Sequence, residues 1–159
     1  MTMKNKQGFT LVEITIVVAI VGLLASLAIL NISNAMETGR KKTAMTELEL
    51  LSTGILQLAW DTGRWPNQEW RDEGASGVNE IWSLVGSGLD KNSVDGVYEG
   101  WEGPYYEGSY TDPWGKPYFF DSDYYHEGRT DRIVVGSFGP NGVGRNIYDS
   151  DNILVFLNE

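Results

Sequence analysis

The chain of 159 residues contains no cysteine. A disulfide framework, a thiolate metal site and a cysteine nucleophile are therefore all excluded. Histidine occurs once, at His126 in the string YYHEG, and no serine nucleophile motif accompanies it. Because a lone histidine of this kind is usually solvated, the sequence favours a protein that is not an enzyme.

Basic residues are scarce in most of the chain. From Asp61 to the C-terminus there are 18 acidic and 7 basic residues, whereas the first sixty residues hold 4 acidic and 5 basic ones. An acidic surface repels the phosphate backbone, so we expect no nucleic acid among the partners. Loops dense in carboxylates suit hard cations such as calcium.

One long apolar run lies near the N-terminus. Residues 9–32 read FTLVEITIVVAIVGLLASLAILNI and carry one charge, at Glu13. At about 1.5 Å per residue this run makes a helix of roughly 36 Å, which is long enough to cross a bilayer. A secretory signal peptide would be shorter and end in a small-x-small site, and a buried core helix would show a polar face. We therefore predict a transmembrane helix over 9–32.

The charge inside this run needs an explanation, because a carboxylate near hydrocarbon is costly unless it finds a partner. Glu13 lies close to the start of the run, so its side chain can reach the lipid headgroups. The alternative is that it pairs with a cation on a neighbouring subunit. The free α-amino group that processing of the chain would create is the obvious candidate.

The string KQGFTLVEI, residues 6–14, resembles the class III leader of type IV pilins and type II secretion pseudopilins. The resemblance implies that residues 1–8 are a leader, and that a prepilin peptidase cuts between Gly8 and Phe9 on the cytoplasmic side. It also implies methylation of the new Phe9 amino group and an assembly role for Glu13. The N-terminus would then be cytoplasmic, and the rest a periplasmic domain of a single-pass inner-membrane protein.

One position of the helix departs from that family, which usually has proline where this chain has Leu30. Without proline the backbone donor is kept, so any local melting of the helix must rely on Gly22, Ser26 and Asn31.

After the membrane segment, apolar residues recur at spacings of three and four and predict an amphipathic helix to about Trp60. They are Ala44, Leu48, Leu51, Ile55 and Leu58. Gly63 and Pro66 end this helix, and short apolar strands follow at 132–135 and 153–157.

The predicted fold is α+β and type IV pilin-like, with a long N-terminal helix packed on a small C-terminal antiparallel sheet. The predicted parts are the leader 1–8, the transmembrane and polymerisation helix 9–32, and the periplasmic domain 33–159, itself divided into 33–60 (helix), 61–131 (variable loops) and 132–159 (strands with a loop).

Further strings narrow the resemblance to the major pseudopilin of the type II secretion system. They are RWP at 64–66, GWEGPY at 100–105 and TDPWGKPY at 111–118. Their prolines, glycines and aromatic side chains are explained as turns and core, although an aromatic loop can also bind sugars.

The segment 137–153, SFGPNGVGRNIYDSDNI, resembles the loop that carries calcium in major pseudopilins. Asp149 and Asp151 stand where that family has its carboxylates, and Asn141 replaces the usual acid. The resemblance implies a structural calcium ion held by these three residues. The alternative is an ordinary acidic hairpin that contains Asp-Ser-Asp.

The function implied is that of a structural subunit, which polymerises through its N-terminal helix into a periplasmic pseudopilus and drives export of folded proteins across the outer membrane. Its expected partners are further copies of itself, other pseudopilins, the prepilin peptidase and the inner-membrane assembly platform. The alternatives are a type IV pilus major pilin, serving adhesion, motility or DNA uptake, a minor pseudopilin, and a binding protein anchored by one helix.

Overall fold

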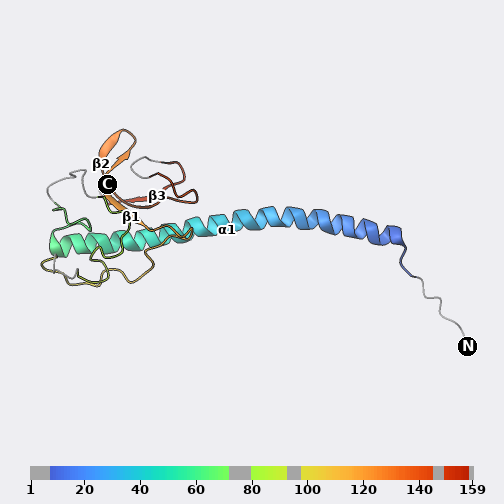
Figure 1. The fold of residues 1–159 in the computed structure, drawn as a ribbon, viewed down its shortest axis with the longest axis horizontal. Helices are drawn as coiled ribbons and strands as arrows, with labels where there is room; N and C mark the ends of the chain where they lie inside the picture. The colour runs from blue at the N-terminus through green and yellow to red at the C-terminus, as the bar shows by residue number, and fades with distance from the viewer. Residues whose placement is uncertain (1–7, 72–79, 93–97, 145–148, 158–159) are drawn as a thin grey trace, which may run out of the picture. The chain divides into compact units, whose positions relative to one another are not determined.

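The computed structural model describes residues 8–71, 80–92, 98–144 and 149–157, without the side chains of 27–31, 126 and 129–131. All of the predicted leader except Gly8 lies outside these residues. The described elements are the helix α1 (Leu11–Thr62) and the strands β1 (Phe119–His126), β2 (Arg129–Ser137) and β3 (Ile153–Phe156) (Figure 1). The chain divides into two compact units, residues 1–39 and 40–159, and each is considered by itself.

The helix α1 continues without interruption past position 30, where leucine keeps the backbone donor that a proline would remove. It ends two residues beyond the predicted Trp60. Gly63 follows with a φ of 68°, the left-handed conformation that terminates many helices, and its N–H donates to the carbonyl of Ala59 at 3.0 Å. The prediction that Gly63 stops the helix is confirmed.

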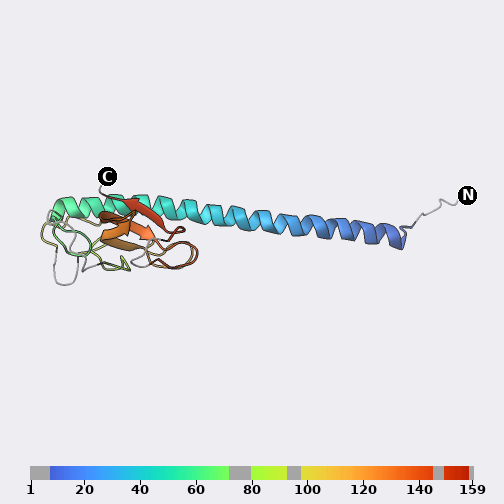
Figure 2. The ribbon, with the colours of Figure 1, turned by 90° about the horizontal axis from the view of Figure 1, so that it is seen from above.

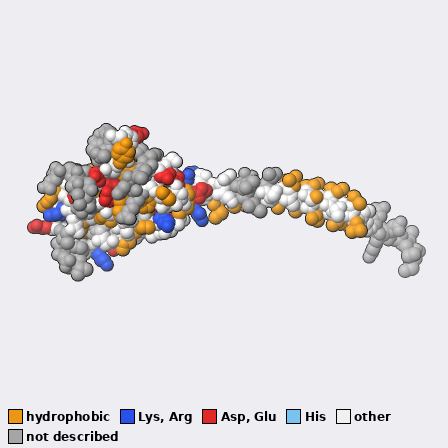
Figure 3. All heavy atoms as spheres, turned by 45° about the horizontal axis from the view of Figure 1, so that its top comes forward, with side chains coloured by type: hydrophobic (Ala, Val, Ile, Leu, Met, Phe, Trp, Pro, Cys, Tyr) orange, Lys and Arg blue, Asp and Glu red, His pale blue; other side chains and the backbone are white. Residues whose placement is uncertain are grey.

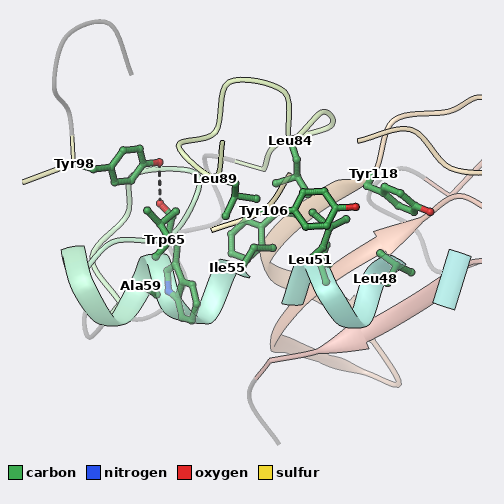
Figure 4. Packing of buried hydrophobic residues seen from close by; sticks show 13 residues of the cluster. Leu48, Leu51, Ile55, Ala59, Trp65, Leu84, Leu89, Tyr98, Tyr106 and Tyr118 are labelled. Carbon is green, nitrogen blue, oxygen red and sulfur yellow. Dashed lines mark hydrogen bonds between the residues drawn. The ribbon is translucent and has the colours of Figure 1, made fainter. Parts of the chain in front are cut away.

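The core of the second unit lies between α1, the strands and the loops that precede them. All five residues of the predicted helical stripe are fully buried. They are Ala44, Leu48, Leu51, Ile55 and Leu58. Four of them pack in one cluster with residues from distant segments, including Trp65, Leu84, Leu89, Tyr98, Tyr106, Tyr118, Phe120 and Val135 (Figure 4). The stripe is therefore core, as predicted.

The three strands form one antiparallel sheet in the order β1-β2-β3. Figure 2 shows the sheet lying alongside the C-terminal part of α1. β1 and β2 are joined by the two residues Glu127 and Gly128, which have φ values of 52° and 81°. Two consecutive residues with positive φ are typical of the tightest hairpin connections.

The strand β1 differs from the prediction, which placed its residues in a loop region, 61–131. The reason is local: Phe119 and Phe120 are both buried, and the pairing with β2 shifts register between Asp121 and Tyr124. A bulge of this kind removes the strict alternation by which a strand is recognised in a sequence. The hairpin extends β2 as well, which begins at Arg129 rather than at 132.

Candidate functional sites

The start of α1 is built as a capping box. The backbone N–H of Thr10 donates to Glu13 Oε2 at 2.8 Å, and the Thr10 hydroxyl donates to the same oxygen at 2.9 Å. In return, the N–H of Glu13 donates to Thr10 Oγ1 at 3.2 Å. These reciprocal bonds satisfy donors that a helix N-terminus leaves without partners. The sequence analysis missed this role, although the spacing Thr-x-x-Glu is its signal.

The capping box gives Glu13 hydrogen-bond donors from its own chain. A carboxylate in the first turn is also favoured by the helix dipole. These contacts hold the side chain at the N-terminal end of the helix. They involve no cation, so neither the headgroup explanation nor the pairing with a neighbouring subunit is tested by them.

The predicted cleavage site lies immediately before the capping box. Gly8 and Phe9 precede the helix and are exposed, with 85% of Phe9 accessible. A Cβ atom added to Gly8 would meet nothing within 4 Å, so the surroundings of the peptide bond between the two residues are open. Cleavage itself stays a prediction.

Large apolar side chains lie exposed on the N-terminal part of α1 (Figure 3). From residue 9 to residue 24 their exposed fractions range from 49% to 85%. They are Phe9, Leu11, Val12, Ile14, Ile16, Val17, Val18, Ile20, Val21, Leu23 and Leu24. An apolar surface of this extent marks a site of contact with lipid or protein.

Among the residues whose side chains are described, no helix is both long and apolar enough to span a membrane. The predicted span 9–32 includes 27–31, whose side chains lie outside the description. The single-pass topology therefore stays a prediction.

The three predicted calcium ligands come together in the loop between β2 and β3. The Asn141 side-chain amide donates to Asp151 Oδ1 at 2.7 Å and to Asp149 Oδ2 at 3.2 Å. The Asn141 backbone N–H donates to Asp151 Oδ2 at 3.2 Å, and its amide oxygen accepts from the N–H of Val143 at 2.6 Å. The two carboxylates, near the end of the loop, thus face one amide from near its start.

Close backbone approach holds the two ends of this loop together. A Cβ atom on Gly139 would lie 2.2 Å from the carbonyl oxygen of Asp151, so only glycine fits there. The N–H of Gly139 donates to Ser137 Oγ at 3.0 Å. Ser137 in turn donates to Asp112 Oδ2 at 2.6 Å, which ties the base of the loop to the turn 111–118.

Asp112 is a buried anchor that the sequence analysis did not single out. Its Oδ1 accepts from the N–H groups of Trp114 and Lys116, at 3.0 and 2.8 Å. An aspartate that opens a turn before proline commonly binds backbone in this way, which is the signal that could have found it. The contact to Ser137, in contrast, has no local signal.

The chemistry of the loop fits a hard cation. The interaction with the Asp151 side chain, followed by hydrogen bonds from the Asp151 backbone N–H and the Asn141 amide, lowers the pKa of Asp149, so that carboxylate is ionised at neutral pH. Carboxylate and amide oxygens are the ligands that calcium takes. Rotation of the Asn141 side-chain amide would turn its oxygen, in place of its nitrogen, toward the carboxylates. The hydrogen bond from the N–H of Val143 would then be lost.

A second group of carboxylates lies at the sheet. Oxygens of Glu80, Asp121 and Asp123 are all within 4.8 Å of one another. Ile81 forms a two-way backbone bridge with Phe120, at 2.9 and 2.8 Å, and this bridge brings Glu80 to β1. Paired carboxylates in an acidic chain are usually ordinary surface, but Asp121 is only 2% exposed.

The electrostatics of this group favour a bound proton. Burial raises the pKa of Asp121 to about 7; the neighbouring charges of Asp123 and Glu80 add to the increase, and a hydrogen bond from the Asp123 backbone opposes it. Near neutral pH the Asp121 carboxyl group is therefore partly protonated and is not a permanent negative charge.

The aromatic tract after residue 97 is structural in this fold. Tyr98 donates its hydroxyl to the carbonyl of Pro66 at 2.8 Å. The same hydroxyl lies 3.3 Å from the carbonyl oxygen of Trp65, the bond drawn in Figure 4. Trp101 donates its indole N–H to the carbonyl of Gly88 at 2.6 Å. These rings use their polar atoms within the chain, which supports the interpretation as core and turn over sugar binding.

Comparison with known families gives two matches that together cover most of the chain. Residues 3–29 match the prokaryotic N-terminal methylation motif. Residues 31–153 match the family described as type II secretion system (T2SS), protein G.

Curated relatives named type II secretion system core protein G align over nearly their full length. The protein from Klebsiella pneumoniae is 29% identical over 94% of this chain and 96% of its own. The protein from Aeromonas hydrophila is 26% identical over 89% of this chain and 88% of its own, and that from Dickeya chrysanthemi is 28% identical over 88% and 81%. No solved structure matches the chain.

Proposed function

This chain belongs to the type II secretion system protein G family and is a structural subunit of the type II secretion pseudopilus; we propose that it is the subunit that polymerises through residues 9–32. The observation that carries this proposal is the apolar surface of the first helical turns, which is exposed on all sides in the single chain. Such a surface is stable only in lipid or against other subunits. Before assembly it would be held in the inner membrane, with the second unit in the periplasm.

Processing between Gly8 and Phe9 is part of the proposal. The match to the N-terminal methylation motif and the open surroundings of Gly8 support it. A prepilin peptidase would cut the leader at the cytoplasmic face and methylate Phe9. The proposed partners afterwards are further copies of this chain, other pseudopilins and the inner-membrane assembly platform.

The new amino group of Phe9 would pair with Glu13 of a neighbouring subunit. In an apolar environment an unpaired charge is costly, so the position at which the two charges meet sets the register between subunits. The capping box with Thr10 supports this role, because it holds the carboxylate at the end of the helix where a neighbour's N-terminus would lie.

We propose calcium as a structural ion of the loop 138–151. Asp149, Asp151 and the amide oxygen of Asn141 would hold it, with backbone carbonyls completing the shell. The ion would replace the N–H donors of the Asn141 amide as the partner of the two carboxylates and would neutralise their charge. It would thereby stabilise the loop and β3, which follows it directly.

The runner-up within the same structural class is a type IV pilus pilin. The match to the protein G family over residues 31–153 supports secretion instead. The polymer would act in the export of folded proteins across the outer membrane.

Mass spectrometry of the native protein tests the proposal. We expect a chain that begins at Phe9 with a methylated amino group, and we expect it in sheared periplasmic filaments. A Gly8→Leu variant serves as the control and should keep the leader and remain unassembled. An intact Met1, or an unmethylated Phe9 in a host that has the peptidase, would contradict the proposal.

A further inference from the structure

Three basic residues stand together on α1 at the start of the second unit. Arg40, Lys41 and Lys42 are consecutive and all exposed, and they are the only basic residues between Lys6 and Arg64. At 3.6 residues per turn, three consecutive side chains spread over about 200° of the helix circumference. These three residues are called the basic collar.

The side chains of the collar are available to a partner outside the chain. Within the part of the chain that the structure describes, they form no hydrogen bond, ion pair or ring contact. In contrast, the guanidinium groups of Arg64, Arg71 and Arg132 each lie over an aromatic ring of the same chain. The charge of the collar therefore needs an explanation other than the packing of the domain.

The distance of the collar from the predicted span indicates where this charge acts. α1 is helical from Ile32 to Arg40, so at about 1.5 Å per residue the collar begins about 12 Å along the helix from the end of the span. Side chains on a helix lean toward its N-terminus, which is the membrane side of the collar. The cationic groups therefore reach back toward the lipid headgroups, into the roughly 10 Å over which ionic attraction acts at about 0.1 M salt.

In the proposed topology the collar lies on the unusual side of the membrane. Segments rich in lysine and arginine beside a span normally stay in the cytoplasm, whereas this one would be periplasmic. From Thr43 to the C-terminus the chain has 20 acidic and 7 basic residues, so an anionic membrane surface repels this part of the domain. The collar offsets the repulsion where the domain leaves the membrane.

We propose that the basic collar binds the phosphate groups of anionic lipids in the periplasmic leaflet of the inner membrane. Guanidinium and ammonium groups bind phosphate through charge-assisted hydrogen bonds, and a polybasic segment beside a span is attracted to anionic lipid. The contact fixes the depth of α1 in the bilayer before the subunit enters the filament. This inference rests on the proposed membrane span of residues 9–32.

Spin-labelled lipids measure this contact in the full-length chain. The chain is reconstituted into phosphatidylcholine vesicles, and a trace of spin-labelled phosphatidylglycerol or phosphatidylcholine is added. The fraction of each label that the protein immobilises gives the relative association of the two lipids. We expect phosphatidylglycerol to associate about fivefold more strongly, which is the effect of one cation near an anionic headgroup. The preference should fall at about 1 M salt, where the range of ionic attraction shortens to about 3 Å.

A triple variant tests whether the collar causes the preference. Arg40→Gln, Lys41→Gln and Lys42→Gln together should abolish it, and glutamine keeps the helix propensity of the segment. Lys91→Gln with Lys116→Gln is the control, because both lysines are exposed and lie outside the collar, and it should keep the preference. Circular dichroism checks that both variants are folded. A preference that survives the triple variant, or that the control also removes, overturns the inference.

Carbonate extraction of the same vesicles separates this inference from the proposed function. A chain that alkaline carbonate releases has no membrane span, which overturns the proposed anchoring and the inference with it. A chain that stays inserted but associates equally with the two lipids overturns the inference alone. In that case a lower filament yield of the triple variant would assign the collar to acidic residues of a neighbouring copy. An inserted chain with a collar-dependent preference supports both.

Discussion

The hydroxyl of Ser137, the last residue of β2, donates a 2.6 Å hydrogen bond to the carboxylate of Asp112, and both side chains are buried. The bond joins the turn 111–118 to the base of the loop that carries Asn141, Asp149 and Asp151. Because Ser137 Oγ also accepts the N–H of Gly139, the turn, the sheet and the loop share one buried polar network.

We expect Asp112→Ala to destabilise the domain by about 2 to 4 kcal/mol, because it leaves the Ser137 hydroxyl and two turn N–H groups without their acceptor. Asp112→Asn keeps an oxygen acceptor and should cost less. Urea denaturation of the full chain in detergent measures both. A loss below about 0.5 kcal/mol for the alanine variant would mean that water replaces the network.

The calcium proposal predicts a ligand-dependent melting temperature. Calcium at a hundred times its Kd should add about 2.7 kcal/mol to the free energy of unfolding of the wild type. Asp149→Ala should lose this gain, whereas Glu102→Ala, an exposed acid outside the loop, should keep it. Melts with calcium and with chelator are compared, and identical curves for the wild type leave the ordinary hairpin as the explanation.

Asn141→Asp restores the acid that the resembling family has at this position. Three carboxylates repel each other, and the amide donors to Asp149 and Asp151 are lost, so the calcium-free protein should melt at a lower temperature. Calcium should bind more tightly because the ligand charge increases. Calorimetric titration measures the affinity, and weaker binding than in the wild type would exclude Asn141 from the ligand set.

Two substitutions of Glu13 separate its capping role from its charge. Glutamine also completes a capping box, so Glu13→Gln should preserve the bonds with Thr10 but remove the charge that meets the neighbouring Phe9 amino group. We expect both Glu13→Gln and Glu13→Ala to leave the second unit folded and to reduce filament yield strongly. Normal filaments from the glutamine variant would assign Glu13 to the helix start alone.

The raised pKa of Asp121 predicts a dependence of stability on pH. The folded protein holds a proton that the unfolded chain releases near pH 4, so this contribution is complete below about pH 4 and is lost as pH rises through about 7. Asp121→Asn should remove the loss, which amounts to about 2 to 4 kcal/mol. The free energy of unfolding of the wild type and of Asp121→Asn is measured between pH 4 and 8 with chelator present. The two curves would be parallel only if Asp121 did not titrate in this range.

The core face of α1 was predictable because it follows from spacing along a single helix. The stripe from Ala44 to Leu58 and the stop at Gly63 each depend on neighbours within a few residues. The strand β1 was not predictable, because its bulge and its two adjacent buried phenylalanines give no alternating pattern. Its existence depends on pairing with β2.

The sequence by itself determined the match to the N-terminal methylation motif and the function class, because the string from Lys6 to Ile14 and the apolar run after it are contiguous. The tertiary structure alone decided which charges meet. Glu80 reaches Asp121 only through the bridge between Ile81 and Phe120, and Asp112 reaches Ser137 only when the turn packs on the sheet. Contacts of this kind depend on the packing of distant segments in one core, so the spacing of residues along the sequence does not predict them.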